Sequence, residues 1–373
     1  MLRLSRKRRF IYFSIIYLIL VALLAVVELG VRLTLPPVSS LDLFVDTSQQ
    51  KAQVVNAQQS GIFEGDPLLL WRLKPNLDDV VWDFTVVSTN AQNLRAEHAI
   101  RAKTPGAIRI VCLGDSVTFG YRVPPVWPER PTEYDPDWLP YPMLLEKNLR
   151  AANPAREVEV ITMAVPGYTS HQGLAWLRRD IDSLEPDLLI VSFGWNDVSF
   201  SEVPDREAIK TNSYAVAVRW IISHSQAFAH TVKLLRSGNQ RQTPVQSGKR
   251  WPVPRVSEQE YLENMSEIVR LARERGAGVI VIAAPYRDRV TNPPEAELMA
   301  RYRRVLRAEM EQKRILFLEV TELTEAAYPS NQGWFDELIH PNHMGHRLMA
   351  AEVLELLSAQ RLTTGLTVPT LTP

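Results

Sequence analysis

A serine lies at a position suited to nucleophilic chemistry. Ser116 ends the triplet Gly114-Asp115-Ser116, which directly follows the apolar run 108–113. If this run is a buried strand, the serine sits at a turn into a helix, with its hydroxyl exposed and its amide near the helix N-terminus. That hydroxyl can attack a carbonyl, and that amide can stabilise an oxyanion. The triplet alone is equally typical of a helix cap, because Asp and Ser often occupy that position.

A possible base lies near the end of the chain, in Asp336-Glu337-Leu338-Ile339-His340-Pro341-Asn342. A serine hydroxyl becomes a nucleophile when a base removes its proton. His340 precedes a proline expected to start a helix, which fixes its position. A carboxylate three or four residues earlier, Glu337 or Asp336, can orient the imidazole. The alternative is that His340 is a turn residue and Asp336 a cap.

Two further segments follow apolar runs and can supply oxyanion donors. Gly194-Trp195-Asn196-Asp197 follows the run 188–193, and the Asn196 side chain can donate an N–H group. Val165-Pro166-Gly167-Tyr168 follows the run 158–163, and a glycine there lets its backbone N–H approach a substrate closely. Each segment alone could be an ordinary loop. Together the four candidates fill the roles of nucleophile, base, orienting acid and oxyanion donors.

The elements that must position these residues follow an alternating pattern. Short apolar runs separated by helical patterns are typical of βαβ units around a buried parallel sheet, so we expect an α/β fold with five parallel strands. The expected strands are 108–113, 158–163, 188–193, 279–284 and 315–320. The expected helices are 142–152, 173–184, 257–275, 295–312 and 344–357.

The four motifs, in this order, resemble those of the SGNH/GDSL hydrolases, here of a membrane-anchored bacterial type. The resemblance covers about 107–357 and implies a flavodoxin-like three-layer α/β/α domain. It implies that Ser116 is the nucleophile and His340 the general base. It further implies that the oxyanion hole comprises the Ser116 and Gly167 amides and the Asn196 side chain.

The sequence departs from the family pattern at two places. The family usually has Asp three residues before the histidine, where this chain has Glu337. That spacing favours Glu337 as the orienting acid, whereas a bulge of one residue would present Asp336. The family often has Asn before its second glycine, where this chain has Met163-Ala164, so Gly167 alone carries over from that motif.

The N-terminal segment has the features of a membrane anchor. Residues 10–27 contain no charged side chain, and residues 2–9 carry five cations. A helix needs about 20 residues to cross the hydrocarbon layer, and the cations favour a cytoplasmic N-terminus. We therefore expect a single-pass membrane protein whose catalytic domain is extracytoplasmic, periplasmic or at the cell surface. A cleaved signal peptide is the alternative, although its apolar stretch is usually about 7–15 residues long.

Composition shifts divide the chain. The expected parts are a basic stub (1–9), a transmembrane anchor (10–35), a tether (36–61), a β-containing flanking segment (62–106), the hydrolase domain (107–358) with insertions at 121–142 and 200–256, and a tail (359–373). Seven prolines lie in 121–142, and 208–257 holds eight Lys/Arg but no Asp or Glu. In 208–257, apolar residues recur at helical spacing, which favours a helix packed on the core or serving as a lid. A basic amphipathic helix near an anionic membrane or polymer is the alternative.

Other classes of function receive no support from the sequence. Lys+Arg and Asp+Glu both number 42, so no net charge draws the chain to nucleic acid. The single cysteine, Cys112, excludes an intrachain disulfide and a multi-cysteine zinc site. His340, His343 and His346 are spaced by three, but no further ligand cluster accompanies them, so we expect no metal. The sequence also has no GxxxxGK[ST] phosphate loop, and we expect no cofactor.

Three functional hypotheses follow. The first is a serine esterase that forms an acyl-enzyme and acts on acyl or acetyl esters of a carbohydrate or lipid. The second is an O-acyltransferase that passes the acetyl group to an envelope or exported polysaccharide; exclusion of water, rather than the triad, would decide between the two. The third is a non-catalytic envelope scaffold, which would not need the intact set of site residues.

Overall fold

The computed structural model describes most of the chain. The described residues are 6–44, 61–96, 98–125, 135, 137–201, 203–210, 212–239, 253–287, 293–327, 331–360 and 365–372. Part of the proline-rich insertion, much of the predicted tether and part of the acid-free insertion therefore lie outside the described residues.

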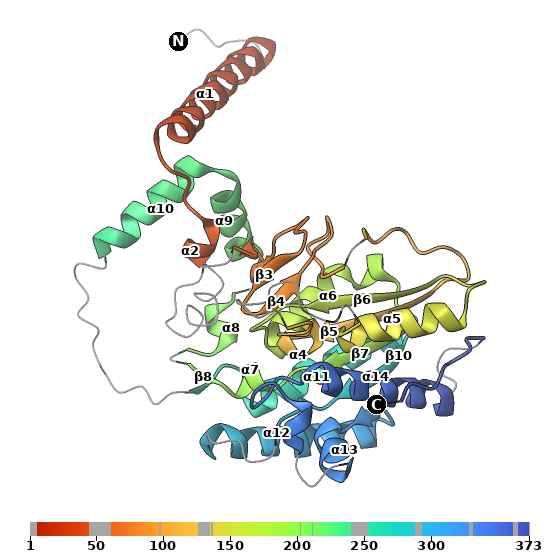
Figure 1. Ribbon diagram of the computed structural model, residues 1–373. Helices are drawn as coiled ribbons and strands as arrows, with labels where there is room; N and C mark the ends of the chain where they lie inside the picture. The colour runs from red at the N-terminus through yellow and green to blue at the C-terminus, as the bar shows by residue number, and fades with distance from the viewer. Residues whose placement is uncertain are drawn as a thin grey trace.

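A five-stranded parallel sheet forms the centre of the molecule (Figure 1). The order β6-β5-β7-β10-β11 places the second of these five strands in chain order at one edge and the first beside it. This is the flavodoxin-like order, and it confirms the predicted fold. The strands are β5 (Ile108–Gly114), β6 (Val158–Ala164), β7 (Leu188–Ser192), β10 (Gly278–Ile282) and β11 (Leu316–Leu318).

Helices cover both faces of this sheet and give three layers. One apolar cluster joins side chains of α6, α11 and α12 to alternate strand residues such as Val111 and Val191. A second joins α5 and α14 to residues of the opposite face, such as Ile110 and Ile190. The helices are α5 (Tyr141–Ala152), α6 (Ser170–Leu184), α11 (Glu258–Glu274), α12 (Pro293–Gln312) and α14 (His343–Gln360).

Short helices occupy several turns, and among them only the helix that begins at Ser116 was expected from the sequence. They are α4 (Ser116–Phe119), α7 (Trp195–Val198), α13 (Val320–Ala327) and the 3-10 turn η1 (Asn331–Trp334). The strand predicted at 315–320 ends at Leu318 because α13 begins at Val320. Helices α4 and α7 place Ser116 and Asn196 in the first turn of a helix, each directly after one of two adjacent strands, β5 and β7.

The N-terminal part consists of one long helix and small elements packed on the domain. Helix α1 (Arg6–Thr34) contains the stretch Phe10–Thr34, which is long and apolar enough to cross a membrane and is not buried against the rest of the chain. The start of the predicted tether is packed instead, since α2 (Ser40–Phe44) buries three of its side chains. Two antiparallel hairpins follow: β1 (Phe63–Asp66) with β2 (Leu70–Leu73), and β3 (Val80–Trp82) with β4 (Thr85–Val87).

The second insertion contains two longer helices where the apolar spacing predicted one. They are α9 (Ser213–His224) and α10 (Gln226–Asn239), separated at Ser225. Ile222 is buried, and Val218, Phe228 and Val232 pack on the core, whereas Ile221 and Leu235 are exposed. The insertion also holds β8 (Phe200–Ser201), α8 (Asp205–Ala208) and β9 (Val253–Pro254).

The end of the described chain is docked on the domain. Asn153 exchanges hydrogen bonds with Thr367, and Arg347 donates to the Thr372 carbonyl. Leu366, Val368 and Leu371 pack against the cluster that contains α5 and α14. The segment 365–372 therefore adds apolar packing to that face of the domain.

Candidate active site

Ser116 begins helix α4 at the C-terminal end of strand β5. The side chain of Asp115 accepts a hydrogen bond from the Val117 amide at 2.9 Å and caps this helix. Gly114 has no room for a side chain, because a Cβ there would lie 2.2 Å from Thr118 Oγ1 and 2.9 Å from the Ser192 carbonyl oxygen. The strand therefore turns directly into the helix, and Ser116 remains only partly buried.

His340 joins Ser116 and Glu337 in a chain of two hydrogen bonds. His340 Nε2 lies 2.8 Å from Ser116 Oγ, and His340 Nδ1 lies 2.5 Å from Glu337 Oε1. The hydrogen bond to His340 lowers the pKa of the Glu337 carboxyl, so this carboxyl is ionised at neutral pH. A carboxylate on Nδ1 leaves Nε2 free to accept the serine proton and stabilises the imidazolium that results.

The segment that carries this histidine is held at both ends. Phe335 forms an antiparallel bridge with Pro341, and the Asp336 amide donates to the His340 carbonyl at 2.9 Å. The Asn342 side chain accepts from the amides of Met344 and Gly345, and so caps α14. Glu337 and His340 are thus fixed within a closed loop at the start of a buried helix.

The structure separates the two candidate acids. Asp336 Oδ2 accepts a hydrogen bond from Arg122 Nη1 at 2.8 Å instead of facing the imidazole. Arg122 also lies 3.7 Å from Asp83, on the loop between β3 and β4. The adjacent Tyr121 ring lies on His340, with ring centroids 4.4 Å apart, and its hydroxyl donates to Asp83. Residues of the flanking segment therefore support one side of the histidine.

Asn196 is placed beside the serine turn by strand β7. Its Nδ2 donates to Asp115 Oδ2 at 3.2 Å. Burial raises the pKa of Asp115 to about 6, although the Val117 amide, His340 and Asn196 oppose the rise. Asn196 and Ser116 lie at the ends of β7 and β5, where the strand order reverses, and this is where open α/β sheets bind their ligands.

Gly167 lies in the turn that follows β6, the other neighbour of β5. Its φ of +85° is a left-handed conformation that favours glycine. The Val165 amide donates to the Gly114 carbonyl at 3.4 Å, which joins this turn to the serine turn. Arg255 Nη1 donates to the Gly167 carbonyl at 2.9 Å from the other side.

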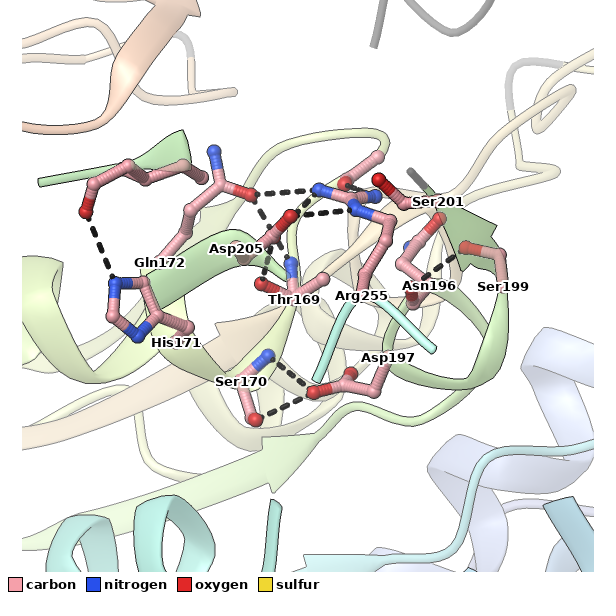
Figure 2. Close-up of polar contacts among 12 residues, drawn as sticks. Thr169, Ser170, His171, Gln172, Asn196, Asp197, Ser199, Ser201, Asp205 and Arg255 are labelled. Carbon is pink, nitrogen blue, oxygen red and sulfur yellow. Dashed lines mark hydrogen bonds and ion pairs between the residues drawn. The ribbon is translucent and has the colours of Figure 1, made fainter. Parts of the chain in front are cut away.

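A buried polar network stands behind the glycine and asparagine turns (Figure 2). Arg255 forms a two-point ion pair with Asp205, at 3.1 and 2.9 Å, and both side chains are only 1% exposed. Thr169 also donates to Asp205, at 2.8 Å. This network ties the turn after β6 to the second insertion.

A second link in the network joins the two turns to each other. The Ser170 amide and hydroxyl both donate to Asp197 Oδ1, at 3.0 and 2.5 Å. Burial raises the pKa of Asp197 to about 7, against the lowering effect of these hydrogen bonds. Since Asp197 follows Asn196 and Ser170 follows the Gly167 turn, the two turns hold a fixed separation.

Sequence reasoning missed the residues that support the site. Arg122 and Arg255 lie in the two insertions, and their partners Asp336 and Asp205 lie 214 and 50 residues away. At these separations, no local sequence pattern indicates that the two members of each pair are in contact. The only available hint was that Arg255 is a cation in a segment without acids, and that pattern favours a surface over a buried pair.

His343 and His346, the other two members of the evenly spaced set, each have a partner of their own. His343 stacks on Trp138, and His346 accepts from the Tyr141 amide. Burial lowers the pKa of His346 to about 3, so it is neutral. Within the described ranges, no group of three His, Cys, Asp or Glu side chains is arranged to hold a metal ion.

Comparison with known proteins identifies the family. The family model of the GDSL-like lipase/acylhydrolases matches residues 112–348, which is more than half of the chain. The chain belongs to this family and is a carboxylic ester hydrolase. No curated protein matches the sequence.

Similar solved structures include three esterases or lipases. One is a catalytic mutant of an acetylxylan esterase from Geobacillus stearothermophilus, with 18% identity, a TM-score of 0.42, and coverage of 67% of this chain and 94% of that one. A lipase/acylhydrolase from Enterococcus faecalis has 19% identity and a TM-score of 0.41, over 70% and 99% of the two chains. A GDSL-like lipase from Bacteroides thetaiotaomicron has 15% identity and a TM-score of 0.40, over 70% and 93%. The family assignment rests on the match over residues 112–348.

Proposed function

We propose that the protein hydrolyses esters through a covalent acyl-enzyme formed on Ser116. The observation that carries this proposal is the pair of hydrogen bonds that links Ser116 Oγ to His340 Nε2 and His340 Nδ1 to Glu337. His340 takes the Ser116 proton as Oγ attacks the ester carbonyl, and gives it to the leaving alcohol as the C–O bond breaks. His340 then takes a proton from water as the water attacks the acyl carbonyl, and returns that proton to Ser116 Oγ as the acyl C–Oγ bond breaks and the acid leaves.

Glu337, rather than Asp336, orients the imidazole in this mechanism. Its carboxylate contacts Nδ1 directly, and its lowered pKa keeps it charged. Asp336 has a different role, because it anchors Arg122 beside the histidine loop. Asp336 therefore supports the loop without contacting the reacting groups.

The oxyanion that develops during attack is stabilised by the Ser116 and Gly167 amides and the Asn196 side chain. These groups lie at the ends of β5, β6 and β7, three adjacent strands. Fixed donors of this kind stabilise charge without reorganisation, and removing one typically costs about 10²–10³ in kcat. The buried network behind Gly167 and Asn196 supports the proposal, because it holds their turns in place.

The chain acts outside the cytoplasm from an uncleaved anchor at α1. Five cations precede the apolar stretch, which favours a cytoplasmic N-terminus. The end of α1 hydrogen-bonds to the folded domain through Glu28 and Arg32, which a removed signal peptide would not do. In that compartment the fitting substrates are acyl or acetyl esters of a carbohydrate or of a lipid.

Hydrolysis of p-nitrophenyl acetate by the full chain in detergent tests this function. We expect turnover by the wild type and a loss of at least about 10³-fold in Ser116→Ala, because the nucleophile is absent. Ser183→Ala is the matched control, since Ser183 lies exposed on α6 and contacts only the Asp180 carbonyl among the described residues. Turnover in Ser116→Ala equal to that of the wild type would refute the mechanism.

A further inference from the structure

Helices α9 and α10 lie at the base of α1, away from the central sheet (Figure 1). They are the larger helices of the acid-free segment 208–257. Both helices hydrogen-bond directly to the end of α1. Gln226 also exchanges hydrogen bonds with the backbone of Val38, just beyond α1.

Glu28 of α1 caps the N-terminus of α10. Its carboxylate accepts from the amides of Gln226 and Ala227, at 2.8 and 3.0 Å, and from the Ser225 hydroxyl at 2.8 Å. A carboxylate at a helix N-terminus is stabilised by the free amides and by the helix dipole. One turn further along, Arg32 donates to Glu28 and to the His224 carbonyl, the last residue of α9. The junction between α9 and α10 is therefore fixed to α1 at Glu28.

The position of Glu28 sets the depth of this junction in a bilayer. Residues 10–27 form the uncharged stretch of the helix, and Glu28 is the next residue. At about 1.5 Å per residue this stretch spans about 27 Å, close to the ~30 Å hydrocarbon layer. Glu28 thus reaches the outer edge of the hydrocarbon. Groups hydrogen-bonded to it lie at the same level, in the headgroup region.

The exposed side chains of the two helices suit that region. On α9, Tyr214 is 79% exposed and Trp220 55% exposed; on α10, Leu235 is 67% exposed. Tyr and Trp are enriched at membrane interfaces, because one end of each side chain is apolar and the other polar. The segment has cations, such as Lys233, and no carboxylates, so its charge complements anionic headgroups.

We propose that α9 and α10 together form a surface that binds the headgroup layer of the membrane in which α1 is anchored. This proposal rests on the proposed anchor. The helices act as a second, peripheral contact that fixes how the catalytic domain is oriented above the bilayer. The occupant of their exposed face is lipid, with anionic headgroups preferred.

Spin-label accessibility in the full chain tests this proposal. The protein is reconstituted in nanodiscs of phosphatidylcholine and phosphatidylglycerol, with nitroxides on Trp220→Cys and Leu235→Cys. Leu20→Cys in α1 reports the anchor, and the exposed Glu311→Cys on α12 reports the aqueous side. Native Cys112 is buried and does not compete for the label.

We expect labels at 220 and 235 to collide more often with oxygen than with a water-soluble nickel complex, as the label at 20 does, and the label at 311 to show the reverse. We also expect less immersion at 220 and 235 in discs without phosphatidylglycerol. If the labels at 220 and 235 have the aqueous accessibility of the label at 311 while the label at 20 is immersed, this proposal is overturned and the proposed anchor is retained. An aqueous label at 20 would overturn both. Labels at 220 and 235 shielded from both reagents would indicate a protein partner and also overturn it.

Discussion

At the scale of single residues, the site contains one chain of hydrogen bonds, from Ser116 through His340 to Glu337, and neighbouring carboxylates with different partners. Glu337 lies on His340 Nδ1, and Asp336, one position earlier, lies on Arg122. Asp115 directly precedes Ser116 and contacts Asn196 and the Val117 amide. Neighbouring acids thus differ in role because of which partner each one meets.

Replacing the acid on His340 is expected to impair catalysis far more than replacing its neighbour. Glu337→Gln should lower kcat for p-nitrophenyl acetate by roughly 10²–10⁴, since losing the orienting carboxylate of a serine triad costs about 10⁴. Asp336→Asn serves as the matched control. It should lower kcat less than about 10-fold, because Asp336 contacts Arg122 and not the reacting groups. Equal effects in steady-state assays would contradict the assignment.

The buried carboxyl of Asp197 should make the unfolding free energy of the protein depend on pH. Burial raises its pKa from the usual 3.8 to about 7, so the folded protein binds this proton more tightly than the unfolded chain does. The stabilisation from protonated Asp197 is complete below about pH 4 and is lost as the pH rises to about 7. Asp197→Asn lacks this titration and keeps an oxygen for Ser170. Its unfolding free energy relative to wild type should therefore rise across that window, by at most about 4 kcal/mol at 1.4 kcal/mol per pKa unit.

Urea unfolding of both proteins at several pH values measures the Asp197 effect. A difference between the two proteins that is constant from about pH 4 to about pH 7 would show that Asp197 does not take up the proton in this window.

At the scale of elements, local pattern and long-range contact account for different parts of the structure. The five strands were predictable because buried parallel strands are short apolar runs, and three of the four site motifs follow such runs directly. A helix was expected after Ser116, but α7, of four residues, and α13, of eight, were not predicted, since such short helices show little periodicity. The insertion was predicted as one helix because its apolar spacing continues across Ser225, where the chain turns to bring Gln226 against α1. Arg122 and Arg255 find their partners only through the tertiary fold.

The buried ion pair behind the Gly167 turn should carry much of the stability of this region. Arg255→Ala leaves Asp205 charged and unpaired in the core, and breaking a buried pair in this way costs about 3–5 kcal/mol. Arg178→Ala, which breaks an exposed pair with Glu267, should cost less than about 1 kcal/mol. Chemical denaturation measures both.

A double variant separates the pair from its surroundings. Removing Asp205 as well should recover part of the loss caused by Arg255→Ala, because the orphaned charge disappears. Strictly additive losses in Arg255→Ala, Asp205→Ala and the double variant would show that the two side chains are not energetically coupled.

At the scale of the whole molecule, helix α1 and the catalytic domain are linked, among the described residues, through α2 and the second insertion. Helix α1 contacts α10, and its apolar side chains are exposed along the rest of its length. The zero net charge of the chain conceals this division, since a basic stub and an acid-free segment are offset by an acidic surplus elsewhere. The serine site and the helix that is apolar enough to cross a membrane therefore lie in separate parts of the chain.

Deleting residues 1–35 should separate attachment from chemistry. The shortened chain is expected in the soluble fraction, with kcat/KM for p-nitrophenyl acetate within about 3-fold of the full chain, since neither Ser116 nor His340 contacts α1. Sedimentation after carbonate extraction and the esterase assay measure the two properties. A shortened chain that still sediments with membranes would contradict α1 as the main anchor.

Reaction with a fluorophosphonate, followed by intact-mass and peptide analysis, tests the central claim most directly. The reagent phosphonylates a serine only when a base activates its hydroxyl. We predict one added group on wild type, located on Ser116, none on Ser116→Ala, and much slower addition to His340→Ala. An unmodified wild type, or a group added equally fast to Ser116→Ala, would contradict an activated serine at this position.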